Sequence, residues 1–269
     1  MGPVDAVIVL RSVTRRFQPR NRPPFTAVQD VSLDVPPGAF LSVVGPSGCG
    51  KSTLLGVISG LQPASGGEVW VEGRLVRDVH PQIGFIFQRD ALMPWKTVLD
   101  NVALALVFRG QPKRRAHAVA REWIARVGLA GFEHYYPHQL SGGMRKRVSL
   151  AQTLVYDPPI VLMDEPFSAL DVQTRNLMEN ELLALWAEDR KTVVFITHDL
   201  EEAIALSDQV VVMTASPGRV KAVYPIDLPR PRNVTEIRFE PAFGRLYERL
   251  WTDLRDEVLV SYERSKAAG

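Results

Sequence analysis

The fold of this chain is decided by Phe40-Leu41-Ser42-Val43-Val44-Gly45-Pro46-Ser47-Gly48-Cys49-Gly50-Lys51-Ser52-Thr53. Residues 40–44 form a short apolar run that predicts a buried strand, and residues 52–58 have the composition of a helix. Residues 45–52 match the spacing G-x-x-x-x-G-K-[ST] between them. Glycines at this spacing let successive backbone N–H groups turn inward around a phosphate, at the positive end of a helix dipole. The stretch therefore predicts a phosphate-binding loop.

Each part of this loop has an expected role in binding a nucleotide. Lys51 would hold the β- and γ-phosphates as a point charge, and the Ser52 hydroxyl would ligate Mg²⁺. Cys49 lies near Lys51 and a helix N-terminus, which both lower the pKa of a thiol. A reactive thiol is therefore one interpretation of Cys49, and a tolerated small residue is the other. The expected nucleotide-binding set in the loop is Gly45, Ser47, Gly48, Cys49, Gly50, Lys51, Ser52 and Thr53.

The segments on either side of the loop indicate an α/β protein. Alternating apolar positions predict strands near residues 7–10 and 28–35, with a proline-rich loop from Gln18 to Phe25. Helical spacing of apolar residues runs from about Thr97 to Tyr156, and an amphipathic helix begins at Pro241. Short apolar runs predict further strands at residues 68–71, 83–87, 160–163, 192–196 and 210–213. Strands that alternate with helices favour a mostly parallel sheet.

Composition excludes several classes of protein. The 269 residues are 46% hydrophobic and 23% charged, which is typical of a globular chain, and we expect one domain over residues 1–269. The net charge of +2 is too small for an electrostatic grip on nucleic acid. A single cysteine excludes an intramolecular disulfide framework. The first six residues do not form a secretory signal, and the longest uncharged apolar run, residues 102–108, is too short to cross a bilayer.

A pair of carboxylates follows the apolar run at residues 160–163. Asp164 could reach a Mg²⁺ ion, and Glu165 could polarise an attacking water as a general base. An acidic residue in this place often caps the following helix instead. The combination with the phosphate-binding loop favours the catalytic interpretation.

A third motif, Ser141-Gly142-Gly143, precedes a predicted helix. It supplies N–H groups, a hydroxyl and a helix dipole, which together suit an anion, although such a motif alone is more often a helix cap. With this motif the sequence resembles the nucleotide-binding subunits of ABC transporters. The resemblance implies that Ser141, Gly142 and Gly143 contact the γ-phosphate of ATP held by a second subunit, in a head-to-tail dimer. Met144, Lys146 and Gln152 depart from the commonest family pattern.

The resemblance covers almost the whole chain and assigns further site residues. Gln88 resembles the glutamine that touches Mg²⁺ or the attacking water, so Ser52, Gln88 and Asp164 form the implied magnesium set. Asp171 resembles the residue that lines the dimer seam, and His198 resembles the histidine that bonds the γ-phosphate. Glu165 and His198 are thus the implied catalytic residues. Either Phe17, at the end of the first strand, or Phe25 would stack on adenine.

The resemblance also implies an architecture. It is a P-loop NTPase (RecA-like) core with an N-terminal antiparallel β subdomain and an inserted α-helical subdomain. The inserted subdomain would span residues 90–156, and a C-terminal extension with an amphipathic helix would span residues 226–269. The implied ligands are ATP and Mg²⁺.

The function implied is ATP hydrolysis that powers a bacterial importer from the cytoplasmic face of the inner membrane. The implied partners are a second copy of the chain, integral membrane permease subunits and, indirectly, a substrate-binding protein. Residues 87–102, 216–219 and 228–232 look like the nitrate, sulfonate and taurine uptake group. The alternative is an ABC ATPase that acts in export, lipid handling or a role outside transport.

Two segments have open interpretations. Residues 89–95 include Trp, Met and Leu, which would suit contact with the membrane partner if they are exposed. Packing of these side chains within the helical subdomain fits the sequence equally well. The C-terminal helix with Trp251 could brace the dimer, regulate it, or simply pack against the core.

Overall fold

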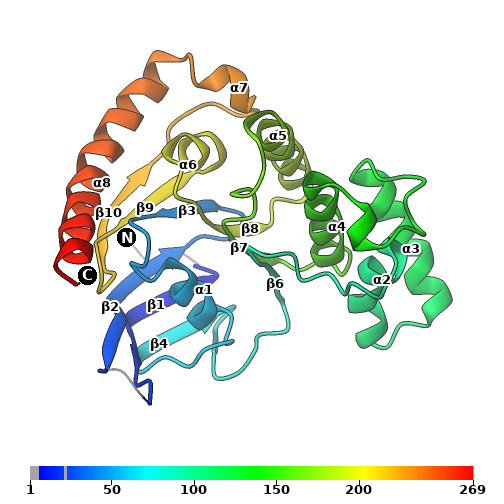
Figure 1. Cartoon of the computed structure of the whole chain (residues 1–269), viewed down its shortest axis with the longest axis horizontal. Helices are drawn as coiled ribbons and strands as arrows, with labels where there is room; N and C mark the ends of the chain where they lie inside the picture. The colour runs from blue at the N-terminus through cyan, green and yellow to red at the C-terminus, as the bar shows by residue number, and fades with distance from the viewer. Residues whose placement is uncertain (1–5, 21–22, 269) are drawn as a thin grey trace. The chain divides into compact units, whose positions relative to one another are not determined.

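The computed structural model describes residues 6–20 and 23–268 (Figure 1). The interpretation of the N-terminus as lacking a secretory signal rests largely on residues 1–5, which lie outside the described residues. The chain divides into two compact units, one formed by the residues up to Pro81 and from Trp186 onward, the other by Gln82–Leu185. The predicted domain boundaries at residues 90–156 and 226–269 stay predictions.

An antiparallel sheet opens the first unit. Its strand order is β2-β1-β4-β5, with β1 at Ile8–Phe17, β2 at Phe25–Val35, β4 at Gly66–Val71 and β5 at Arg74–Leu75. Buried and exposed side chains alternate along much of β2, as expected for a sheet with one face on the core. This sheet is the N-terminal antiparallel part that the sequence predicts.

A mostly parallel sheet holds the phosphate-binding loop in the same unit. The central strand is β3 (Phe40–Val44), which pairs in parallel with β8 (Thr192–Ile196) and with β9 (Gln209–Met213). The antiparallel strand β10 (Val220–Pro225) pairs with β9. Every residue of β3 and of β8 is buried, which explains why both strands are apolar except for Ser42 and Thr192. Helix α1 (Lys51–Ile58) follows the loop.

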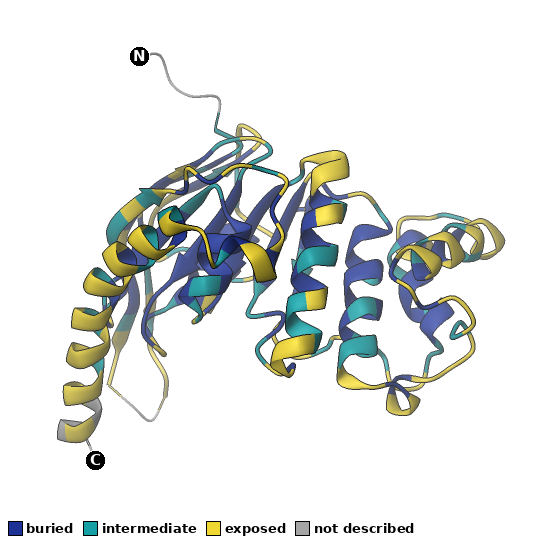
Figure 2. Cartoon of the chain, turned by 90° about the horizontal axis from the view of Figure 1, so that it is seen from above, coloured by how far each residue is buried: buried dark blue, intermediate teal, exposed yellow. Residues whose placement is uncertain are grey.

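The first unit also contains the helices α6 (Leu200–Leu206), α7 (Val234–Ile237) and α8 (Pro241–Ala268). Helix α8 contacts α6 and β9 and runs beside β10 (Figure 1). Its side chains Phe243, Leu250 and Leu254 are buried. Figure 2 shows that the outer side of this helix is exposed along most of its length.

The second unit combines a strand pair with a helical cluster. Strands β6 (Ile83–Ile86) and β7 (Ile160–Asp164) are parallel. Helices α2 (Val98–Phe108), α3 (Lys113–Arg126) and α4 (Gly142–Leu154) enclose one apolar core, and a 3₁₀ turn at Pro137–Gln139 precedes α4. The buried sides of these helices meet in Figure 2. Helix α5 (Val172–Asp189) leads out of this unit.

No helix among residues 6–20 and 23–268 combines the length and the apolar character that a membrane crossing requires.

Candidate functional site

The phosphate-binding loop has the backbone that its glycines predict. Gly50, directly before α1, has a φ of 105°, in the left-handed region that favours glycine. A Cβ atom at Gly50 would lie 2.6 Å from the carbonyl oxygen of Ala27. No other residue type therefore fits at this position without moving β2.

The N-terminus of α1 is prepared for an anion. No side chain caps it, and its first turn contains no acidic residue. Lys51 is only 6% exposed, and its Nζ donates to the carbonyl oxygens of Gly45 at 2.8 Å and Pro46 at 3.1 Å. The ammonium group is thus held against the loop, while Ser47, Gly48 and Ser52 are exposed. The loop N–H groups, the helix dipole and Lys51 together supply positive charge suited to phosphate.

Cys49 does not have the reactive thiol that one interpretation predicted. Its side chain is 1% exposed, and burial raises the pKa of the thiol. Lys51 lowers this pKa, as expected, but its effect is smaller than that of burial. The reactivity hypothesis is therefore wrong, because the sequence indicates the nearby charge but not the burial.

Gln88 and Glu165 meet in the second unit, although 77 positions separate them in the sequence. Gln88 follows β6, and its Nε2 donates to Oε2 of Glu165 at 3.1 Å. Glu165 follows β7 with a φ of 42°, a left-handed backbone that is strained for a residue with a side chain. Asp164 ends β7, and α5 begins only at Val172, so Asp164 does not cap that helix. The arrangement favours the catalytic interpretation of the carboxylate pair.

The Ser141-Gly142-Gly143 motif lies at the start of α4. Ser141 and Gly142 are exposed, and the Ser141 hydroxyl accepts a hydrogen bond from the backbone N–H of Met144 at 3.3 Å. Ser141 is therefore a helix cap within this chain. The exposed N-terminus of α4 also remains suitable for an anion.

Comparisons with known proteins identify the family, and the three motifs lie inside the matched region. The profile of the family described as "ABC transporter" matches residues 28–168. The chain belongs to the ABC transporter family. It is an ATPase subunit of that family.

Individual relatives cover most of the chain. An uncharacterized ABC transporter ATP-binding protein of Methanocaldococcus jannaschii is 50% identical over 235 residues, 87% of this chain and 86% of that protein. The taurine import ATP-binding protein of Rhizobium johnstonii is 45% identical and covers 83% of this chain and 87% of its own length. A dimeric ATP-binding cassette in a post-hydrolysis state with ADP and Pi has a TM-score of 0.73 and 32% identity, over 82% of this chain and all of that one. The P-loop NTPase fold is thus confirmed.

Two more residues assigned from the ABC family lie at helix starts. His198 is exposed and precedes Asp199, whose side chain caps α6 by accepting from Glu201 N at 2.9 Å. Asp171 is exposed and precedes α5, where its Oδ1 accepts from Thr174 N at 3.0 Å, and this hydrogen bond lowers the pKa of Asp171. Both side chains are therefore accessible and lie on well-fixed backbone.

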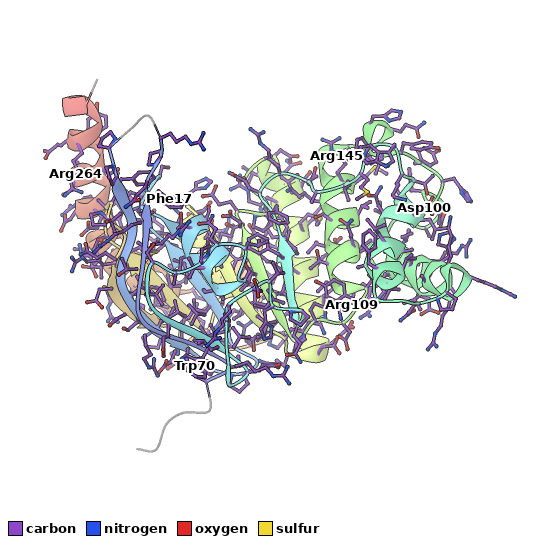
Figure 3. The ribbon with its side chains drawn as sticks, turned by 90° about the horizontal axis from the view of Figure 1, so that it is seen from below. Phe17, Trp70, Asp100, Arg109, Arg145 and Arg264 are labelled. Atoms are coloured by element: carbon purple, nitrogen blue, oxygen red, sulfur yellow. The ribbon has the colours of Figure 1, made fainter. Side chains whose placement is uncertain are left out.

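The two aromatic candidates for the adenine lie against each other. Phe17 ends β1 and pairs in register with Phe25, the first residue of β2. Their ring centroids are 5.2 Å apart at an interplanar angle of 20°, and the guanidinium of Arg15 lies 4.6 Å from the Phe17 ring centre. Figure 3 shows the position of Phe17. The two rings form one stack, so the choice between them is a choice between two faces of that stack.

The sequence did not indicate the role of Lys146. This side chain is 4% exposed, and its Nζ donates to the carbonyl oxygen of Gln88 at 2.7 Å and pairs with Asp90 at 3.0 Å. Arg145 of the same helix also reaches Asp90, at 3.3 Å. Helix α4 therefore holds the segment that carries Gln88. Only the departure of Lys146 from the family pattern signalled this residue in advance.

The residues assigned to Mg²⁺ fit a hard cation. Ser52, Gln88 and Asp164 supply hydroxyl, amide and carboxylate oxygens, which Mg²⁺ prefers, and it commonly keeps several waters. Among the residues that the structure describes, no cluster of three or more His, Cys, Asp or Glu side chains could hold a metal.

Proposed function

We propose that this chain binds and hydrolyses ATP to power a bacterial importer for nitrate, a sulfonate, taurine or a related small solute. The observation that carries the proposal is the hydrogen bond between Gln88 and Glu165, since it joins a polar amide to a carboxylate on strained backbone. In a protein with a complete phosphate-binding loop, this pair suits the orientation of a water for attack on phosphorus.

The proposed division of labour follows the chemistry of each group. Lys51 and the loop amides hold the β- and γ-phosphates, and the ring stack of Phe17 and Phe25 offers a face to adenine. Glu165 accepts a proton from the attacking water, and His198 donates a hydrogen bond to the γ-phosphate. When bound at Ser52, Gln88 and Asp164, Mg²⁺ would neutralise charge on the phosphates.

The substitution Glu165→Gln tests the assignment of the general base. It removes the proton acceptor but keeps the shape of the side chain, so we expect ATP turnover to fall by roughly 10²–10⁴-fold. ATP affinity should stay unchanged, because the phosphate-binding loop is untouched. Steady-state hydrolysis and equilibrium nucleotide binding measure the two quantities. Near-normal turnover would contradict the role of Glu165.

We further propose that the working form is a head-to-tail dimer. The exposed start of α4 at Ser141 would contact the γ-phosphate held by the second copy, and Asp171 would line the seam. The dimeric cassette with ADP and Pi, at a TM-score of 0.73, supports this assembly.

The membrane partner would bind near Trp95. This side chain is 72% exposed, whereas its neighbour Leu92 packs against the core of the helical cluster. The loop that presents Trp95 is held by buried Asn101, which accepts from Met93 N at 2.8 Å and donates to the Lys96 carbonyl at 3.0 Å. An exposed tryptophan on a fixed loop suits a binding surface. Both interpretations of residues 89–95 are therefore proposed to hold, since Leu92 packs within the helical cluster and Trp95 is exposed for contact with a partner.

The cargo would belong to the nitrate, sulfonate and taurine group. The 45% identity to a taurine import ATP-binding protein supports a sulfonate, since taurine is itself an aminosulfonate. The permease and a substrate-binding protein would select the cargo. The subunit would lie at the cytoplasmic face of the membrane, held there through the permease.

A further inference from the structure

The turn at residues 214–219 packs directly on the phosphate-binding loop. A Cβ atom at Gly218 would lie 2.0 Å from the carbonyl oxygen of Cys49, so the two backbones touch. Gly218 N donates to the Ala27 carbonyl at 2.9 Å, and the Gly218 carbonyl accepts from Gln29 N at 2.9 Å. A shift of this turn would therefore move the surface against which the loop rests.

The turn is closed by hydrogen bonds of its own. The Thr214 hydroxyl donates to the Pro217 carbonyl at 3.1 Å and accepts from Arg219 N at 3.0 Å. Thr214 N also donates to the Arg219 carbonyl at 2.9 Å. Because of these hydrogen bonds, we expect residues 214–219 to move together when any one of them is displaced.

Helix α8 holds this turn from the other side. Glu257 accepts from Ala215 N through Oε2 at 2.9 Å and pairs with Lys221 through Oε1 at 3.0 Å. Arg264 donates to the Ser216 carbonyl, and Figure 3 shows it near the end of α8. Two charged side chains of one helix thus bind the backbone of two consecutive residues of the turn. Charge-assisted hydrogen bonds of this type are stronger than neutral ones.

We propose that α8 positions the phosphate-binding loop through the 214–219 turn, with Glu257 and Arg264 as positioning residues. The loop binds phosphate through backbone N–H groups that must be fixed before the ligand arrives, so a loosened turn lowers nucleotide affinity. The inference rests on the proposed function, because it takes this loop to be the ATP site. The proposal gives helix α8 a role in nucleotide binding, the first step of ATP hydrolysis.

Cys49 is the only cysteine of the chain and reports directly on the loop. Its labelling by Ellman's reagent requires local opening, because the thiol is buried. We expect Glu257→Ala and Arg264→Ala to raise the labelling rate roughly tenfold or more, as loss of a hydrogen bond to a charged group predicts. Asp256→Ala and Arg255→Ala, on exposed neighbours in the same helix, should leave the rate unchanged.

The same variants are then tested for nucleotide binding. We expect the dissociation constant for ADP and the KM for ATP to rise roughly tenfold in Glu257→Ala and Arg264→Ala, with a smaller change in kcat. Glu257→Gln keeps an oxygen that can accept from Ala215 and should give intermediate values. Thermal unfolding of each variant verifies that it is folded.

The outcomes separate this inference from the proposed function. Unchanged labelling in folded Glu257→Ala and Arg264→Ala would overturn it, and so would faster labelling without any loss of ADP affinity. A wild-type chain that neither binds ADP nor hydrolyses ATP would contradict the proposed function. The labelling rates would still decide whether α8 holds the loop.

Discussion

Lys146 shows how one buried side chain can fix the geometry of the proposed catalytic pair, Gln88 and Glu165, without joining it. Its ammonium binds the carbonyl of Gln88, whose own side chain donates to Glu165. The lysine therefore acts on the backbone of Gln88 rather than on substrate. Arg could replace this donor in part, whereas Met would leave the carbonyl and Asp90 without it.

We predict that Lys146→Met lowers kcat about tenfold, because the loss of a charge-assisted hydrogen bond frees Gln88. The KM for ATP should change little, since the phosphate-binding loop is not touched. Lys146→Arg should recover part of the rate, and Arg114→Met on exposed helix α3 is the matched control. A rise in KM with kcat unchanged would contradict the positioning role.

Burial also sets the chemistry of Cys49. In the folded chain, burial raises the pKa of the Cys49 thiol above its ordinary value of 9.0. The thiol therefore loses its proton at a higher pH in the folded chain than in the unfolded chain. Stability from this group is present below the ordinary thiol pKa and is lost as pH rises through the folded-state value. We predict slow labelling of native protein at pH 7 and fast labelling of urea-unfolded protein. Equal rates in the two states would contradict the burial of the thiol.

At the scale of elements, Arg232 closes the end of α6. This buried guanidinium donates to the carbonyls of Ser207 at 2.7 Å and Leu228 at 2.9 Å, and more weakly to those of Ile204 and Ala205. Burial lowers its pKa to about 10, so it is still charged at pH 7. A positive charge at a helix C-terminus opposes the negative end of the helix dipole.

We predict that Arg232→Met lowers the free energy of unfolding by about 3 kcal/mol, because several buried carbonyls lose their donor. Arg232→Lys should recover little, since an ammonium lacks the planar fork of donors. Arg245→Met, on an exposed position of α8, is the control. Urea unfolding measures all three, and a loss below about 0.5 kcal/mol for Arg232→Met would contradict the capping role.

Prediction of strands from the sequence succeeded where every residue of the strand is buried and failed where burial is partial. Strands β3 and β8 have the bounds predicted, because every one of their residues is buried and all but Ser42 and Thr192 are apolar. Strand β1 ends at Phe17, the position expected for the end of the first strand, although the apolar alternation is visible only near residues 7–10 because the later part contains exposed arginines. Strand β10 was missed because none of its residues is fully buried.

The same limit applies to the candidate site. The phosphate-binding loop and the carboxylate pair are predicted from the sequence, because each follows a recognisable strand, whereas Gln88 is assigned only through the resemblance to the family. The contribution of Lys146, the burial of Cys49 and the stacking of Phe17 on Phe25 depend on contacts between distant segments. A motif states which groups are present but not what surrounds them.

At the scale of the whole molecule, the dimer proposal predicts a change in mass with ligand. Glu165→Gln should convert from monomer to dimer in ATP but not in ADP, because the γ-phosphate would be retained between the copies. Adding Ser141→Arg should abolish the dimer, whereas Thr252→Arg on exposed α8 should not. Light scattering at several protein concentrations measures this shift. A Glu165→Gln chain that stays monomeric in ATP would contradict the proposed assembly.

The pairing of β3 determines how late in synthesis its sheet can form. This strand leads into the phosphate-binding loop, yet its neighbours β8 and β9 follow about 150 and about 170 residues later in the sequence. During translation, β3 therefore has no hydrogen-bonding partner in its sheet until most of the polypeptide has been synthesised. An apolar strand without its partners invites self-association, so nascent chains that stall before Thr192 should depend strongly on chaperones.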